Sequence, residues 1–106
     1  MELRLSIRSL DPNVRIDIPN GKIAEGITIK QELTLKEILN PPIDFIVYIA
    51  EHYVLPAAAT LTANYLYDKL KDRKDKPITI NEQPVEINAK NIEQVIIINL
   101  SKKENK

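Results

Sequence analysis

The residue types best suited to chemistry gather in one short stretch, around the only histidine of the chain. Asp44, Tyr48, Glu51 and His52 are spaced at i, i+4, i+7 and i+8. In a helix, that spacing places two carboxylates, a phenol and an imidazole along one stripe. Such a set could transfer a proton or bind a polar ligand. Polar stripes of this kind are far more often the solvent face of an amphipathic helix, so we predict a partner-contacting surface here and no catalytic residue.

Several other chemistries are excluded by residue types that the chain lacks. It has no cysteine and a single histidine, which excludes disulfides, thiolate nucleophiles and the common zinc sites. Its two glycines, Gly21 and Gly26, cannot build a P-loop or a dinucleotide-binding fingerprint. The sequence therefore predicts no metal, no cofactor and no enzymatic activity.

The overall charge of the chain favours no particular partner. Fifteen basic and fifteen acidic side chains cancel. A nucleic-acid binder of zero net charge would need a local basic patch to neutralise phosphates. The candidate patch consists of Lys69, Lys71, Arg73, Lys74 and Lys76. Nucleic-acid binding through this segment is therefore the alternative to protein binding.

Alternating apolar and polar side chains predict strands in the first third of the chain. Residues 3–8 and 14–18 both alternate in this way. A tight turn between them would pair Ile7 with Ile18 and place all the apolar side chains on one face. The alternation over residues 27–33 predicts a third strand.

The longest apolar stretch predicts one long helix over residues 43–72. Pro56 lies within it, so the helix either bends there or a second helix begins. Beyond the proline, small side chains recur at helical spacing and would allow another backbone to approach closely. In a soluble protein such residues usually pack tightly on a sheet or a partner helix, and they are also a second candidate contact surface, suited to a homo-oligomer: Ala58, Ala59, Thr62 and Ala63.

The last third of the chain predicts a hairpin and a closing amphipathic segment. A two-residue turn at Glu82 and Gln83 would pair Ile80 with Val85. Residues 92–100 fit a helical face, and the β-branched run within them also fits a strand; we favour the helix. Residues 1–101 are expected to form one domain, with residues 102–106 as a frayed tail.

A membrane span is disfavoured by the acids and the histidine of the apolar stretch. Only residues 53–67 separate His52 from Asp68, fewer than the roughly 20 apolar residues that a spanning helix needs. The first ten residues alternate charge with apolar side chains, which is not the pattern of a signal peptide. We therefore predict a cytoplasmic protein without a membrane span.

Residues 45–87, FIVYIAEHYVLPAAATLTANYLYDKLKDRKDKPITINEQPVEI, resemble the C-terminal half of the effector-associated constant component domains. The resemblance implies a small non-catalytic helper of a prokaryotic conflict or defence system. It rests on pattern, and Glu51, His52 and Pro56 stand where the family's long helix commonly has a glycine-rich entry. No site residue is carried over from it.

Together these patterns predict an α+β fold. We expect a mainly antiparallel sheet of four to six strands, with the 43–72 helix packed on one face and a short C-terminal helix. The expected function is that of a small interaction or adaptor module, whose partner is another protein or a second copy of the chain.

Overall fold

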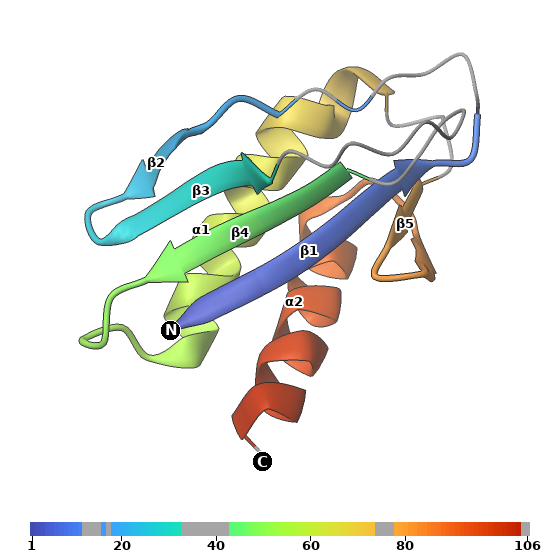
Figure 1. The fold of residues 1–106 in the computed structure, drawn as a ribbon. Coiled ribbons are helices and arrows are strands. Elements are labelled where there is room, and N and C mark those ends of the chain that lie inside the picture. Colours follow the sequence, from blue (N-terminus) through green and yellow to red (C-terminus); the bar gives the residue numbers. More distant parts are fainter. Residues whose placement is uncertain (12–15, 17, 33–42, 74–77, 105–106) are drawn as a thin grey trace.

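The computed structural model describes residues 1–11, 16, 18–32, 43–73 and 78–104. They form one six-stranded antiparallel sheet in the order β2-β3-β4-β1-β5-β6, with two helices behind one face of it (Figure 1). The strands are β1 (Glu2–Ser9), β2 (Gly21–Ala24), β3 (Ile27–Glu32), β4 (Ile43–Ile49), β5 (Ile78–Ile80) and β6 (Gln83–Val85); the helices are α1 (Leu55–Leu70) and α2 (Ala89–Glu104), with a 3-10 turn, η1, at Lys71–Arg73. The predicted α+β class is confirmed.

The first strand lies in the middle of the sheet, and this overturns the predicted N-terminal hairpin. β1 pairs with β4 along Glu2–Ile7 and with β5 along Ile7–Ser9. Ile7 therefore lies between Ile43 and Ile80, and no edge remains at which Ile18 could pair with it. Ile18 is buried without belonging to a strand; part of the predicted second strand and its turn lies outside the described residues.

The predicted helix over residues 43–72 is wrong in its first part, which is the strand β4. Phe45, Val47 and Ile49 point into the core and are at most 4% exposed. Ile46 and Tyr48 lie on the opposite face and are also apolar. A strand with apolar side chains on both faces gives one continuous apolar run, which periodicity cannot distinguish from a buried helix.

The open question about Pro56 is answered by the start of α1. The helix begins at Leu55, so Pro56 lies in its first turn, where a backbone N–H would have no partner within the helix. Before it, residues 50–54 form a turn. The Ala50 N–H donates to the Gly26 carbonyl at 2.8 Å and so joins this turn to the one between β2 and β3. The proline therefore begins a helix instead of bending one.

The two helices are antiparallel neighbours and form the second layer of the fold. β4 and β5 both run antiparallel to β1, so they are parallel to each other and need a crossover, which α1 supplies. α2 begins after Asn88, whose side-chain Oδ1 accepts a hydrogen bond from the Asn91 N–H at 2.8 Å. Residues 92–100 are thus helical, as favoured from the sequence.

The β5–β6 hairpin exists, but its turn lies one residue earlier than predicted. Asn81 and Glu82 both have positive φ, 50° and 69°, and form the turn. Ile80 therefore pairs with Gln83, and Ile78 pairs with Val85. Asparagine tolerates positive φ better than most residues, which favours a turn that starts at Asn81.

Candidate functional site

The four residues of the predicted polar stripe do not form one site. Asp44 and Tyr48 lie on the outer face of β4, four residues apart in a strand, which separates them by about 13 Å. Glu51 and His52 lie in the turn after β4 and are exposed. The helical spacing that suggested one cluster does not apply, because β4 is not helical.

His52 lies against the turn between β2 and β3. Its ring centroid is 4.6 Å from that of Tyr53, whose hydroxyl donates to the Glu25 carbonyl oxygen. A Cβ on Gly26 would lie 3.1 Å from the imidazole carbon Cε1, and Gly26 has a φ of +84°. The two turns thus pack closely, and His52 contributes to the packing between them.

The small side chains of α1 face inward. Ala58, Ala59, Thr62 and Ala63 are at most 1% exposed and belong to the core of the subunit. They cannot contact a partner in this fold, so the prediction of a contact surface at these four residues is wrong. Their size lets α1 pack closely on the layers beside it.

The described part of the basic segment is engaged within the chain. The Lys69 ammonium lies 5.3 Å from the centroid of the Tyr65 ring, and Lys71 pairs with Asp68 at 3.0 Å. That pairing lowers the pKa of Asp68 and raises the pKa of Lys71. The side chain of Arg73 and all of Lys74 and Lys76 lie outside the described residues, so the patch stays a prediction.

Neither a metal-binding cluster nor a membrane-crossing helix is present in the described part of the chain. There, no group of three or more histidine and acidic side chains could hold a metal ion. Neither α1 nor α2 combines the length and apolarity that a bilayer-crossing helix needs.

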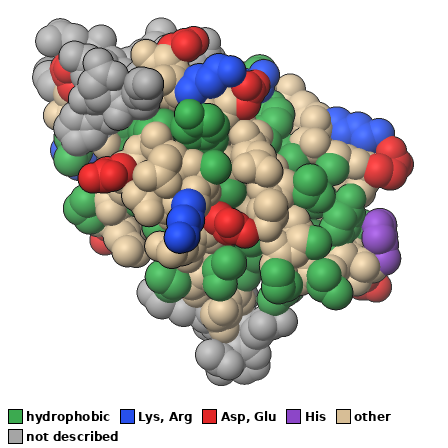
Figure 2. Space-filling model, turned by 180° about the vertical axis from the view of Figure 1, so that it is seen from behind, with side chains coloured by type: hydrophobic (Ala, Val, Ile, Leu, Met, Phe, Trp, Pro, Cys, Tyr) green, Lys and Arg blue, Asp and Glu red, His purple; other side chains and the backbone are tan. Residues whose placement is uncertain are grey.

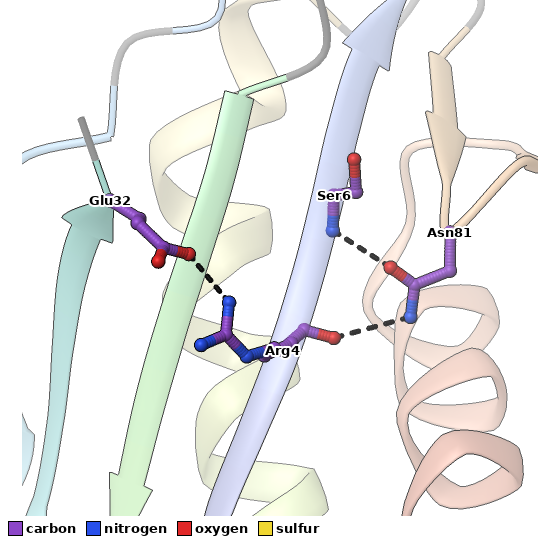
Figure 3. Close-up of polar contacts among 4 residues, drawn as sticks. All are labelled: Arg4, Ser6, Glu32 and Asn81. Carbon is purple, nitrogen blue, oxygen red and sulfur yellow. Dashed lines mark hydrogen bonds and ion pairs between the residues drawn. The ribbon is translucent and has the colours of Figure 1, made fainter. Parts of the chain in front are cut away.

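The sheet face turned away from the helices carries charges of both signs. We call it the open sheet face; it includes Arg4, Ser6, Arg8, Thr28, Lys30, Glu32, Asp44, Ile46 and Tyr48. The Arg4 guanidinium reaches over β4 to the Glu32 carboxylate, with the two atoms 2.6 Å apart (Figure 3). A short ion pair therefore occupies part of this face.

At the neighbouring edge of β1, the side chain of Asn81 replaces backbone pairing (Figure 3). Its Oδ1 accepts from the Ser6 N–H at 2.8 Å, and its Nδ2 donates to the Arg4 carbonyl at 3.3 Å. The Asn81 N–H also donates to the Ser6 carbonyl at 2.8 Å. One residue thus extends the contacts of the short strand β5 along β1.

The outer surface of the helix layer carries fewer charges than the open sheet face. On α2 its charged residues include the exposed Lys90 and also Glu93, whose carboxylate lies within hydrogen-bond distance of the Thr60 hydroxyl. The sequence has no charged residue over 55–67 of α1 or over 94–101 of α2. We call the exposed residues of this surface the uncharged helix face: Val54, Pro56, Ala57, Thr60, Leu61, Asn64, Gln94, Ile97, Ile98 and Ser101. Figure 2 shows hydrophobic side chains gathered over the lower part of this layer.

An apolar groove lies at one end of the uncharged helix face, where α1 begins and α2 ends. Its volume is about 510 Å³. It is lined by Met1, Tyr53, Val54, Leu55, Pro56, Ile97, Leu100 and Ser101. Two of these large apolar side chains are well exposed: Val54 by 66% and Ile97 by 39%.

No protein-family model, curated protein sequence or solved structure gave a significant match to this chain. These comparisons therefore do not assign the chain to a family. The resemblance to the effector-associated constant component domains accordingly stays a prediction.

The sequence reasoning missed the residues that now form the best candidate site. Ile97 and Ile98 were assigned to a β-branched run, and Val54 and Leu61 to a core helix. The available signal was the absence of charge, because a helix exposed only to water usually carries charged side chains on its outer face.

Proposed function

We propose that this protein is a small non-catalytic interaction module, and that its contact surface is the uncharged helix face. The observation that supports this proposal is the exposure of Val54, Leu61, Ile97 and Ile98 on one helix layer. Exposed apolar patches of this kind mark contact surfaces, whose centres are depleted of charge.

The open sheet face is a weaker candidate for the same role. Its charges have opposite signs, and Arg4 is already paired with Glu32. The basic residues of this face therefore do not form a continuous patch for phosphate groups. No described feature favours nucleic-acid binding over protein binding.

Site-specific photo-crosslinking tests the proposal. A photoreactive residue is placed at Ala57, which is exposed on the outer side of α1, and in a matched variant at Thr28, which is exposed on the open sheet face. We expect protein adducts in the native cell extract from position 57 and few from position 28. Equal labelling from both positions, or nucleic-acid adducts from position 28 alone, would refute the proposal.

A further inference from the structure

We infer that Asn20 and Gly21 form a self-modification site, at which the side-chain amide of Asn20 is hydrolysed to a carboxylate when the edge strand β2 opens locally. They are the only Asn-Gly pair of the chain. Both residues are exposed, and Gly21 is the first residue of β2. The site contains no residue of the uncharged helix face, so the inference does not depend on the proposed function.

The reaction needs only these two residues and water. The backbone nitrogen of Gly21 loses its proton to hydroxide and attacks the side-chain carbon Cγ of Asn20, which closes a cyclic imide. The bond from Cγ to Nδ2 breaks, and ammonia leaves with a proton from water. A water molecule then opens the ring at either carbonyl and gives aspartate or isoaspartate. Glycine favours the attack because it has no Cβ to hinder the approach of its nitrogen.

The fold does not require a glycine at position 21. Asn-Gly is typical of tight turns, in which the glycine takes a positive φ. Here Gly26 has the positive φ, +84°, whereas Gly21 begins a strand. Apart from its neighbours in the chain, the nearest atom to a Cβ added at Gly21 would be the Tyr65 hydroxyl oxygen at 3.8 Å, an ordinary van der Waals contact. Gly21→Ala should therefore fold normally while it hinders the reaction.

The paired strand holds the reacting groups in place. Oδ1 of Asn20 accepts a hydrogen bond from the Gln31 N–H at 2.6 Å, and Gly21 pairs with Ile29. Ring closure turns the Asn20 side chain toward its own backbone and takes the Gly21 nitrogen out of its peptide plane, which strand pairing resists. The reaction therefore proceeds from a locally opened β2, and the population of that open state sets its rate.

The edge position of β2 makes such opening accessible. β2 has four residues, pairs only with β3 and has an irregular register between Lys22 and Ala24. Short elements with few contacts open at the lowest free-energy cost. A contact from the helix layer limits this opening, because the Tyr65 hydroxyl donates to the Pro19 carbonyl at 3.1 Å.

Conversion of Asn20 would change this edge of the sheet. Aspartate adds a negative charge and keeps an oxygen that can accept from the Gln31 N–H. Isoaspartate lengthens the main chain by a methylene, which moves Gly21 out of register with Ile29. The isoaspartate form should therefore have a looser β2.

Ageing of the intact chain at mildly alkaline pH, followed by peptide mapping with mass spectrometry, tests the inference. We expect Asn20 to be converted, more slowly than in the same chain unfolded in urea. Gly21→Ala should lose most of the conversion. Unmodified Asn20 after the unfolded chain has been fully converted would overturn the inference. Equal rates in the folded and unfolded chain would also overturn it, because local opening would then not be limiting.

Tyr65→Phe tests the role of local opening. The variant loses the hydroxyl that donates to Pro19, so Asn20 should be converted about two- to tenfold faster, the factor that corresponds to the loss of one hydrogen bond. Tyr67→Phe is the matched control, because it removes a hydroxyl from the same helix and leaves that of Tyr65 in place. A rate unchanged in Tyr65→Phe, or raised equally by the control, contradicts the inference.

Amide hydrogen exchange separates local opening from general loss of stability. Exchange at Gln31, whose N–H is bonded to the Asn20 side chain, should quicken in Tyr65→Phe by the same factor as the conversion. Exchange at Val47, which is fully buried in β4, should stay unchanged. Equal acceleration at both residues would mean that Asn20 reacts from the unfolded chain, and the proposed local opening would be wrong.

Discussion

The two outer surfaces of this protein differ in the kinds of side chain that they expose. The open sheet face carries arginine, lysine, aspartate and glutamate, and Arg4 and Glu32 pair across an intervening strand. The uncharged helix face exposes Ile97 and Ile98, and the charged groups beside it include the Glu93 carboxylate, which is hydrogen-bonded to Thr60. The difference agrees with the proposal that the helix layer is the contact surface.

The first prediction tests the comparison within a single strand, β4. Phe45 faces the helices and is 1% exposed, whereas Ile46 lies on the open sheet face. Phe45→Ala should lower the free energy of unfolding by about 3–5 kcal/mol, because it leaves a cavity in the core. Ile46→Ala should lower it by about 1 kcal/mol or less. Urea denaturation measures both.

Similar losses in the two variants would contradict this prediction. They would mean that Ile46 is covered by another surface, and that the sheet face is not open in solution.

The second prediction concerns Asn81, at the edge of β1. Asn81→Gly keeps the positive φ and removes the side-chain amide, so it should lower the free energy of unfolding by about 1–2 kcal/mol. Asn81→Ala should cost more, because an alanine is strained at that φ. Amide hydrogen exchange at Ser6 should be faster in both variants, since its N–H loses the Asn81 Oδ1 acceptor. Unchanged exchange in Asn81→Gly would refute the assigned role.

Strands in which apolar and polar side chains alternate, such as β3, could be predicted from the sequence, whereas β4 could not. β3 was predicted over 27–33 and spans Ile27–Glu32, because its polar positions include Thr28 and Lys30. β4 was mistaken for a helix because Ile46 and Tyr48 are apolar on its outer face. Its place between β1 and β3 depends on contacts distant in sequence, which local patterns do not contain.

The candidate site was less predictable than the fold. Sequence reasoning sought a cluster of chemical groups and selected Asp44, Tyr48, Glu51 and His52, which the strand geometry and the following turn separate. Burial then removed Ala58 and its small neighbours from the surface. Which apolar residues of a helix stay exposed depends on how the helix is rotated against the sheet, and only the packed structure shows it.

The third prediction compares the inner and outer sides of α1. The Thr62 hydroxyl is fully buried, and among the described residues it has no hydrogen-bond partner. Thr62→Val keeps the shape and removes the unsatisfied group, so it should raise the free energy of unfolding by about 1 kcal/mol. The control is Thr60→Val on the exposed side, where the Thr60 hydroxyl lies within hydrogen-bond distance of the Pro56 carbonyl and of the Glu93 carboxylate. The control should change stability by at most about 0.5 kcal/mol, and without a gain. Thermal unfolding of both variants distinguishes them, and a loss of stability in Thr62→Val would show that its hydroxyl has a partner.

The fourth and smallest effect concerns the charges of the β2–β3 hairpin. A hydrogen-bonded ion pair with Lys22 lowers the pKa of Glu25 below its ordinary value of 4.5. A carboxyl group whose pKa is lower in the folded state stabilises the fold above its unfolded pKa, and this contribution is lost as the pH falls through the folded pKa. Lys22→Met should therefore raise the pKa of Glu25 toward 4.5, and the stability difference between the two proteins should vanish at lower pH. Both side chains are exposed, so added salt should reduce the shift in the original protein.

Carboxyl NMR titration measures this shift, with Asp68 as an internal control because Lys71 holds its pKa independently. An unchanged pKa of Glu25 in Lys22→Met would mean that Lys22 is not engaged with Glu25 in solution. Lys22 lies opposite Thr28, so its ammonium would then be a second lysine cation on the open sheet face in addition to Lys30. Anion binding would become a realistic role for that face, and the contrast with the uncharged helix face would no longer identify a single contact surface. A pKa of Glu25 that rises toward 4.5 in Lys22→Met shows instead that Lys22 and Glu25 satisfy each other in the original protein, which agrees with the proposal that the helix layer is the contact surface.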